Sequence, residues 1–202
     1  MTSRTVSTMA PNISLRRTTA DDADQVAAWR AEPAARAYQP LKQHAVTRLR
    51  SILADRGARP IGPASEGKFQ WIVETPGGDA GWITITVLHR EYGIGALGYT
   101  ITSSLHRRGY ASAAVRAILP TVFSEEALNL FRLEAVAAVD NIASRRVLEG
   151  NGFLFEGILP RLLEVNGVMI DHARYSLNRL QWRERFVEPT GTNQHEEEDI
   201  AR

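Results

Sequence analysis

The sequence contains no cysteine, has only two lysines, Lys42 and Lys68, and has no long apolar segment. The missing cysteine excludes thiol catalysis, zinc ribbons, iron–sulfur clusters and a disulfide framework, and it fits a reducing compartment. No apolar run approaches the roughly 18 residues that a membrane span requires, and the N-terminus lacks the apolar core of a secretion signal. We therefore expect a cytoplasmic protein that does not act at a membrane.

The chain has 202 residues, of which 44% are hydrophobic and 23% are charged, as in an ordinary globular domain. We expect a flexible polar tail at residues 1–12, a single domain at 13–186 and a disordered acidic tail at 187–202. The acidic tail holds five acidic residues and one arginine, a net charge of −4, so the remaining 186 residues carry +5. This slight positive charge gives no reason to expect nucleic-acid binding.

Helix and strand patterns alternate between the tails. Alternating and apolar runs predict strands at residues 13–17, 69–74, 80–89, 95–102, 131–139, 153–165 and 168–177. Apolar stripes at helical spacing predict helices at 21–29, 44–56, 111–126 and 143–149, the first of them capped by Thr18 or Thr19. Asn166-Gly167 joins the last two strands as a hairpin turn. This order implies a mixed α/β sheet with helices on both faces.

A strand, a short loop and a helix N-terminus follow each other around residues 97–114. Such a junction leaves about four N–H groups unpaired and carries roughly half a positive charge. Gly109 lets the backbone pass close to a ligand, and Ser112 adds a hydroxyl donor. The small Ala111 leaves room, and two cations stand at the same mouth, Arg107 and Arg108. The junction predicts an anion site sized for a pyrophosphate; the alternative is a structural corner whose arginines face water.

A second polar motif opens the following helix. Asn141 ends a strand, so its amide can both cap that helix and reach a ligand. Ser144 lies three residues further, one turn along the same face. Taken alone, Asn141 is better explained as a helix cap and Ser144 as an exposed residue of the first turn.

These motifs occur in a fixed order: GYTI at residues 98–101, RRGYAS at 107–112, RLEAV at 132–136 and N-x-A-S-x-x-V-L-x-x-x-G-F at 141–153. Together with the closing hairpin VNG-V-x-x-D-H-x-x-Y-S-L, the pattern resembles the GNAT superfamily of N-acetyltransferases. More narrowly it resembles the RimJ/RimL-type enzymes, which are named for acetylating the α-amine of ribosomal proteins. The resemblance runs from about Ile13 to Trp182.

The resemblance implies the GNAT fold, a mixed and mostly antiparallel sheet of about seven strands. Acetyl-CoA would lodge in a V-shaped splay between the central parallel strands, 95–102 and 131–139. Backbone groups near Tyr99 and Ile101 would hold the pantetheine arm and polarise the thioester carbonyl. Asn141 would also bond this arm, and Ser144 would lie near the sulfur. The pyrophosphate would be held by the amides of Arg107, Arg108, Gly109, Tyr110, Ala111 and Ser112.

The implied reaction is direct attack of a neutral amine on the thioester, with no acyl-enzyme and no metal. The chain departs from the family pattern at three positions, because His106 opens the pyrophosphate loop, Ala96 replaces a familiar glutamate and Leu148 replaces a tyrosine acid. We expect Ser144 to be the general acid that protonates the leaving thiolate.

For the general base the first candidate is Glu134, because a carboxylate in an apolar strand should have a raised pKa. The alternative is an outward-facing Glu134 paired with an arginine. His172 and Asp171 on the last hairpin are weaker candidates, and a water chain is a further possibility.

The acceptor depends on segments that the family leaves variable, so several classes stay open. The first is the α-amine of a protein or peptide, and the second is a small-molecule amine such as an antibiotic, polyamine or amino sugar. A catalytically silent acyl-CoA-binding module is a third. An acidic pocket would favour a polycation, and a groove open at both ends would favour a peptide. Either a monomer or a homodimer fits the sequence.

Overall fold

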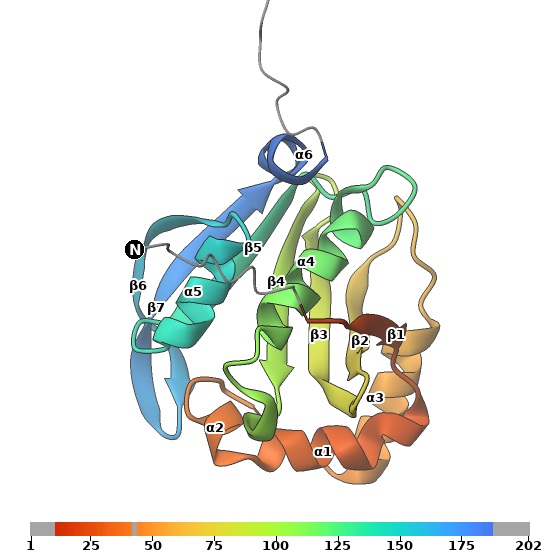
Figure 1. Ribbon diagram of the computed structural model, residues 1–202, viewed down its shortest axis with the longest axis vertical. Coiled ribbons are helices and arrows are strands. Elements are labelled where there is room, and N and C mark those ends of the chain that lie inside the picture. The colour runs from red at the N-terminus through yellow and green to blue at the C-terminus, as the bar shows by residue number, and fades with distance from the viewer. Residues whose placement is uncertain (1–10, 42–43, 188–202) are drawn as a thin grey trace, which may run out of the picture.

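The structure is a computed structural model that describes residues 11–41 and 44–187 (Figure 1). Seven strands form one sheet in the order β1-β2-β3-β4-β5-β7-β6. The strands are β1 Ser14–Arg17, β2 Gly67–Thr75, β3 Gly78–His89, β4 Ile94–Ile101, β5 Arg132–Ala138, β6 Leu154–Val165 and β7 Val168–Asn178. The helices are α1 Ala23–Ala31, α2 Pro33–Arg36, α3 Val46–Ala58, α4 Tyr110–Phe123, α5 Ile142–Gly150 and α6 Arg179–Phe186.

The sheet is mixed and mostly antiparallel, as the sequence predicts. Within the described residues, β4 and β5 run parallel and the other neighbouring strands run antiparallel. The register pairs Ile94–Ala96 with Arg132–Glu134 and then ends. Leu97–Ile101 of β4 and Ala135–Ala138 of β5 lie beyond this paired stretch, while β5 stays paired with β7. The two central strands therefore splay apart, which confirms the predicted V-shaped opening.

Two hydrophobic clusters fix helices to opposite faces of the sheet. The larger one places α4 against the sheet through Val115, Ile118 and Leu119, and the smaller one lies under α1 and α3. In Figure 1, α4 and α5 cross the near face on either side of the splay. In the smaller cluster the rings of Trp29 and Trp82 stack with centroids 6.2 Å apart. The sheet thus lies between two helical layers.

Of the two predicted caps of the first helix, Thr19 is the one observed: its side chain accepts from the Asp21 N–H, and Asp22 accepts from the Thr19 N–H at 2.7 Å. Most element boundaries agree with the predicted ranges, with two informative differences. Helix α4 ends at Phe123 instead of residue 126, because Ser124 adopts an extended backbone. Two short helices were not predicted, α2 and α6, since neither is long enough to show an apolar period.

The two predicted tails lie almost entirely outside the described residues. Residues 11, 12 and 187 are the parts of them that the structure includes. The division into two tails and one domain therefore stays a prediction.

Candidate active site

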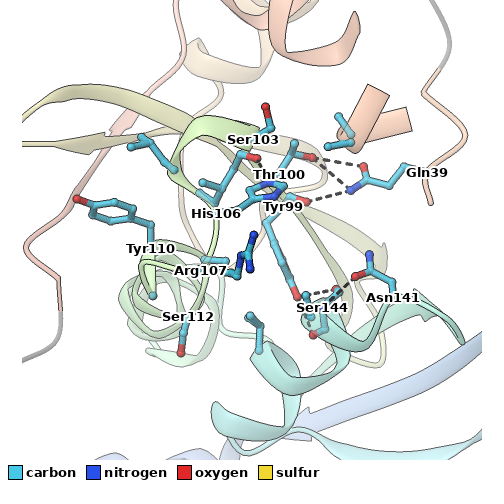
Figure 2. A pocket seen from close by; sticks show the side chains of 18 residues that line it. Gln39, Tyr99, Thr100, Ser103, His106, Arg107, Tyr110, Ser112, Asn141 and Ser144 are labelled. Carbon is cyan, nitrogen blue, oxygen red and sulfur yellow. Dashed lines mark hydrogen bonds between the residues drawn. The ribbon is translucent and has the colours of Figure 1, made fainter. Parts of the chain in front are cut away.

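A pocket of about 500 Å³ opens where the splay meets the N-termini of α4 and α5 (Figure 2). Helix α2 contributes Ala34 and Ala35 to its other side. The predicted site residues that line it are Tyr99, Ile101, Arg107, Gly109, Tyr110, Ala111, Ser112, Asn141 and Ser144. The structure therefore brings the two sequence motifs together around one space, although about 30 residues separate them in the chain.

The open edge of β4 presents the backbone of alternate residues to this pocket. The Thr102 N–H donates to the Ala80 carbonyl at 2.8 Å, so Thr102 and Thr100 direct their backbone groups toward β3. The intervening residues, Tyr99 and Ile101, must direct theirs into the splay. Their carbonyls accept from side chains on that side, Tyr99 from Gln39 Nε2 at 3.2 Å and Ile101 from His106 Nε2 at 2.8 Å. Their N–H groups are the donors that a ligand at this edge would meet.

The predicted anion site has the backbone that it needs. Gly109 has φ 80° and ψ −2°, a left-handed conformation, and directly precedes α4. The N–H groups of the first turn of α4 therefore face the pocket mouth. Because a carbonyl can only accept, the His106 bond to Ile101 requires a proton on Nε2 and pins the loop to the end of β4.

The two arginines of the loop differ in their position. Arg107, with φ 59°, lines the pocket, and both arginines are exposed. Arg108 is not among the lining residues, so for this residue the alternative of a solvent-facing arginine fits the structure better.

The start of α5 places a hydroxyl pair at the inner end of the pocket. Asn141 caps the helix, since its Oδ1 accepts from the Ser144 N–H at 3.1 Å. The Ser144 Oγ lies 2.8 Å from the Tyr99 hydroxyl, which also donates to the Ser144 carbonyl at 3.2 Å (Figure 2). Burial raises the pKa of Tyr99 to about 12, although the bond to Ser144 acts in the opposite direction. The phenol is therefore neutral at physiological pH and both hydroxyl groups carry protons.

Glu134 does not have the raised pKa that the sequence predicts. Burial acts to raise its pKa, but hydrogen bonds from Arg132 Nε at 2.9 Å and Arg174 Nη2 at 2.7 Å together bring it below the usual value. Glu156 completes a network with the same two arginines. Glu134 also does not line the pocket. The alternative of an arginine-paired carboxylate is correct, and the original reason for assigning Glu134 as the base is lost.

The weaker base candidates are held by the last hairpin. His172 is 2% exposed, and its Nδ1 lies 3.1 Å from the Ile170 carbonyl. The Asp171 carboxylate accepts from the Arg161 N–H at 2.8 Å. Among the described residues that line the pocket none is acidic, and the histidine is His106.

Sequence reasoning missed the segment around α2, which closes the pocket through Ala34, Ala35 and Gln39. Gln39 bonds the Tyr99 carbonyl and also lies 3.3 Å from Thr100 Oγ1. Glu32 accepts from Thr102 Oγ1 at 2.6 Å and from the Ser103 N–H at 2.8 Å, which ties the α1–α2 junction to the end of β4. The segment between α1 and α3 has no periodic pattern, so no sequence signal pointed to these contacts.

Residues 12–154 match the family described as the acetyltransferase (GNAT) domain. The chain belongs to this family, as the sequence motifs indicate. Part of the chain is 40% identical over 86 residues to a putative ribosomal N-acetyltransferase, YdaF of Bacillus subtilis, which covers 43% of this chain and 46% of YdaF. Across three Bacillus subtilis relatives the matched segment covers 41%, 46% and 54% of the relative, so the chain spans about half of their length.

Solved structures share the fold. Mycobacterium smegmatis RimJ, in complex with CoA-disulfide, superposes with a TM-score of 0.72 at 29% identity over 85% of this chain and 84% of RimJ. Spermidine N-acetyltransferase from Vibrio cholerae, in complex with CoA and spermine, has the same TM-score at 17% identity, over 84% of this chain and 97% of that protein. At this lower identity the likeness shows the fold alone.

Proposed function

We propose that the protein transfers an acetyl group from acetyl-CoA to a primary amine, and that the acceptor is the α-amine of a protein or peptide. The observation that carries the proposal is the convergence of three elements on one pocket. These are the open backbone edge of β4, the N-terminus of α4 and the hydroxyl of Ser144. A cytoplasmic location, and assembly as a monomer or homodimer, stay predictions.

The pocket fits an acyl-CoA in its chemistry as well as its shape. A pyrophosphate needs closely spaced N–H donors and positive charge, which the turn at Gly109, the first turn of α4 and Arg107 supply. An extended amide-containing arm needs a strand edge, which Tyr99 and Ile101 supply at the splay. The Asn141 cap uses only Oδ1, so its Nδ2 is a further donor toward the same arm.

In the proposed reaction acetyl-CoA supplies the acetyl thioester, and the chain orients and polarises it. An N–H at the open edge of β4, from Tyr99 or Ile101, donates to the thioester oxygen and stabilises the negative charge that develops during attack. Ser144 donates its proton to the departing sulfur, and the proton that the amine nitrogen loses as the amide forms restores the Ser144 hydroxyl. The neutral Tyr99 hydroxyl, 2.8 Å from Ser144 Oγ, orients this group. The remaining rate enhancement comes from holding amine and thioester in contact.

Two features favour an α-amine over a lysine side chain or a polyamine. No described residue lining the pocket is acidic, so a polycation gains no carboxylate partner there. At pH 7.5 roughly a quarter of an α-amine with pKa near 8 is neutral, against roughly one in a thousand for a lysine amine. A pocket without a carboxylate base therefore suits the α-amine. The likeness to YdaF, a putative ribosomal N-acetyltransferase that is 40% identical over 86 residues, supports a protein acceptor.

The proposal is tested by steady-state release of CoA thiol with matched acceptors. The panel holds a peptide with a free α-amine, the same peptide with its α-amine blocked and a lysine free, a polyamine and an amino sugar. We expect turnover with the first peptide and little with the second, and mass spectrometry should place the added acetyl group at the N-terminus. Preferred turnover of the polyamine or amino sugar would instead establish the small-molecule class.

A non-catalytic module is separated from both by combining this assay with calorimetry. Tight acetyl-CoA binding with no thiol release on any amine would replace the catalytic proposal. Failure to bind acetyl-CoA at all would remove the cofactor assignment itself.

A further inference from the structure

Asn151 is a buried polar residue that does not itself line the pocket but bonds to two residues that do, Ser112 and Val147. It directly follows α5, is 0% exposed, and its backbone N–H donates to the Val147 and Leu148 carbonyls. Its Nδ2 donates to the Val147 carbonyl at 2.8 Å and to Ser112 Oγ at 3.0 Å. Asn151 therefore links the end of α5 to the first turn of α4, where Ser112 lines the pocket.

The direction of the bond to Ser112 follows from the chemistry of its neighbour. A carbonyl oxygen can only accept, so the amide atom that faces Val147 must be the nitrogen. The same nitrogen faces Ser112, which means that Ser112 Oγ accepts this bond and its own proton points in another direction. Ser112 lines the pocket and Asn151 does not. The Ser112 hydroxyl proton is therefore available to an anion in the pocket.

The arrangement leaves one polar atom without a partner. Asn151 Oδ1 is buried and makes no hydrogen bond among the described residues. Burying an unpaired carbonyl oxygen costs folding free energy, which an apolar side chain of similar size at this position would avoid. The stability of the fold alone therefore does not explain why an amide side chain occupies this buried position.

We propose that Asn151 is a positioning residue for acyl-CoA: it holds the Ser112 hydroxyl with its proton directed at the cofactor's phosphate. This inference rests on the proposed function, because it takes the pyrophosphate to lie at the start of α4. Helix α5 then serves both ends of the cofactor, with Ser144 at its start and Asn151 immediately after its end.

The test compares acetyl-CoA with S-acetylpantetheine, which carries the same thioester and no phosphate. The readout is the ratio of their kcat/KM values, measured for wild type, Ser112→Ala, Asn151→Leu and the double variant. Ser112→Ala should lower the ratio about tenfold, the worth of one hydrogen bond to a charged group. Asn151→Leu should lower this ratio by up to the same factor. In the double variant the ratio should fall no further than in Ser112→Ala. Ser124→Ala, just beyond the far end of α4, is the matched control and should leave the ratio unchanged.

Different outcomes overturn different statements. An unchanged ratio in Ser112→Ala would remove the pyrophosphate from the start of α4, and with it the proposed cofactor placement. Two other outcomes would refute the positioning role alone, provided that Ser112→Ala lowers the ratio. In the first, Asn151→Leu leaves the ratio unchanged. In the second, the fold-losses of the two single variants multiply in the double variant. If Asn151→Leu does not fold, Asn151→Ala removes the same two hydrogen bonds and is read by the same ratio.

Discussion

Gly109 and Gly167 form a matched pair of backbone substitutions, because both have nearly the same left-handed conformation. Their φ angles are 80° and 81°. Gly109 lies at the mouth of the pocket, whereas Gly167 lies in the turn between β6 and β7. A substitution at either position meets the same backbone strain, and only the one at Gly109 changes the candidate pyrophosphate site.

The magnitude follows from the local geometry. A side chain in the left-handed region costs about 1–2 kcal/mol relative to glycine. At Gly109 an added Cβ would lie 3.4 Å from Pro11 Cδ and 3.5 Å from its Cγ, which is ordinary contact, and at Gly167 it would meet nothing within 4 Å. Gly109→Ala and Gly167→Ala should therefore lose similar stability, about 2–8 °C in melting temperature for a chain of this size.

Acetyl-CoA affinity should separate the two variants. Relaxing the strained φ at Gly109 turns the N–H groups at the start of α4 away from the anion, so we expect at least a tenfold weaker Kd for Gly109→Ala. Gly167→Ala should keep the wild-type Kd. Isothermal titration calorimetry measures the affinity, and a thermal melt of the same samples measures the stability. Equal Kd values for the two variants would refute the assignment of the pyrophosphate to this turn, and Gly109→Val should abolish binding if it is correct.

Three further predictions concern side chains. Ser144→Ala should lower kcat roughly 100-fold with little change in acetyl-CoA affinity; if both stay at wild type, Ser144 is only a first-turn residue. Glu134→Gln should leave kcat unchanged and lose about 1 kcal/mol of stability at pH 7. Because its arginines lower the pKa of Glu134, this difference should shrink as the pH falls below the ordinary glutamate pKa of about 4.3 and vanish below the lowered pKa. A large loss of kcat would instead restore Glu134 as the base. The pKa of Tyr99 is raised to about 12, so its contribution to stability is complete below pH 10 and lost as the pH rises through 12. Tyr99→Phe should remove that alkaline loss. The difference between the ultraviolet titrations of wild type and Tyr99→Phe reports the Tyr99 phenol, and a midpoint near 10 in this difference would contradict the prediction.

The geometry of the candidate anion site could be predicted because each of its parts is local in sequence. Gly109 and the start of α4 follow β4 within one short loop, so strand, turn and helix signals suffice to place an anion site. Asn141 and Ser144 are likewise three residues apart on one helix. What the sequence could not predict was the Tyr99–Ser144 bond, which joins residues 45 positions apart. That contact depends on how widely β4 and β5 splay.

For Glu134 a local signal favoured one of the two interpretations that the sequence left open. Arg132 lies two residues before it on the same strand, so the period of two places both side chains on one face of the sheet. That spacing alone favoured an ion pair over a desolvated carboxylate. The second partner, Arg174, comes from β7 through pairing that no local pattern reveals. An apolar strand is therefore insufficient reason to expect a raised carboxylate pKa when a cation occupies the next position on the same face.

The acceptor side is harder to read from sequence for a physical reason. On β4 the groups proposed to meet the cofactor are backbone N–H groups, which are selected by the pairing with β3 and do not depend on side-chain identity. The opposite wall comes from α2 and Gln39, a short segment whose position is fixed by single contacts such as the Glu32 bonds to Thr102 and Ser103. Changes there can reshape the acceptor entrance without disturbing the sheet or the anion site. One scaffold can thus serve different amines, and the acceptor class has to be read from the residues of this wall and not from the motifs that identify the family.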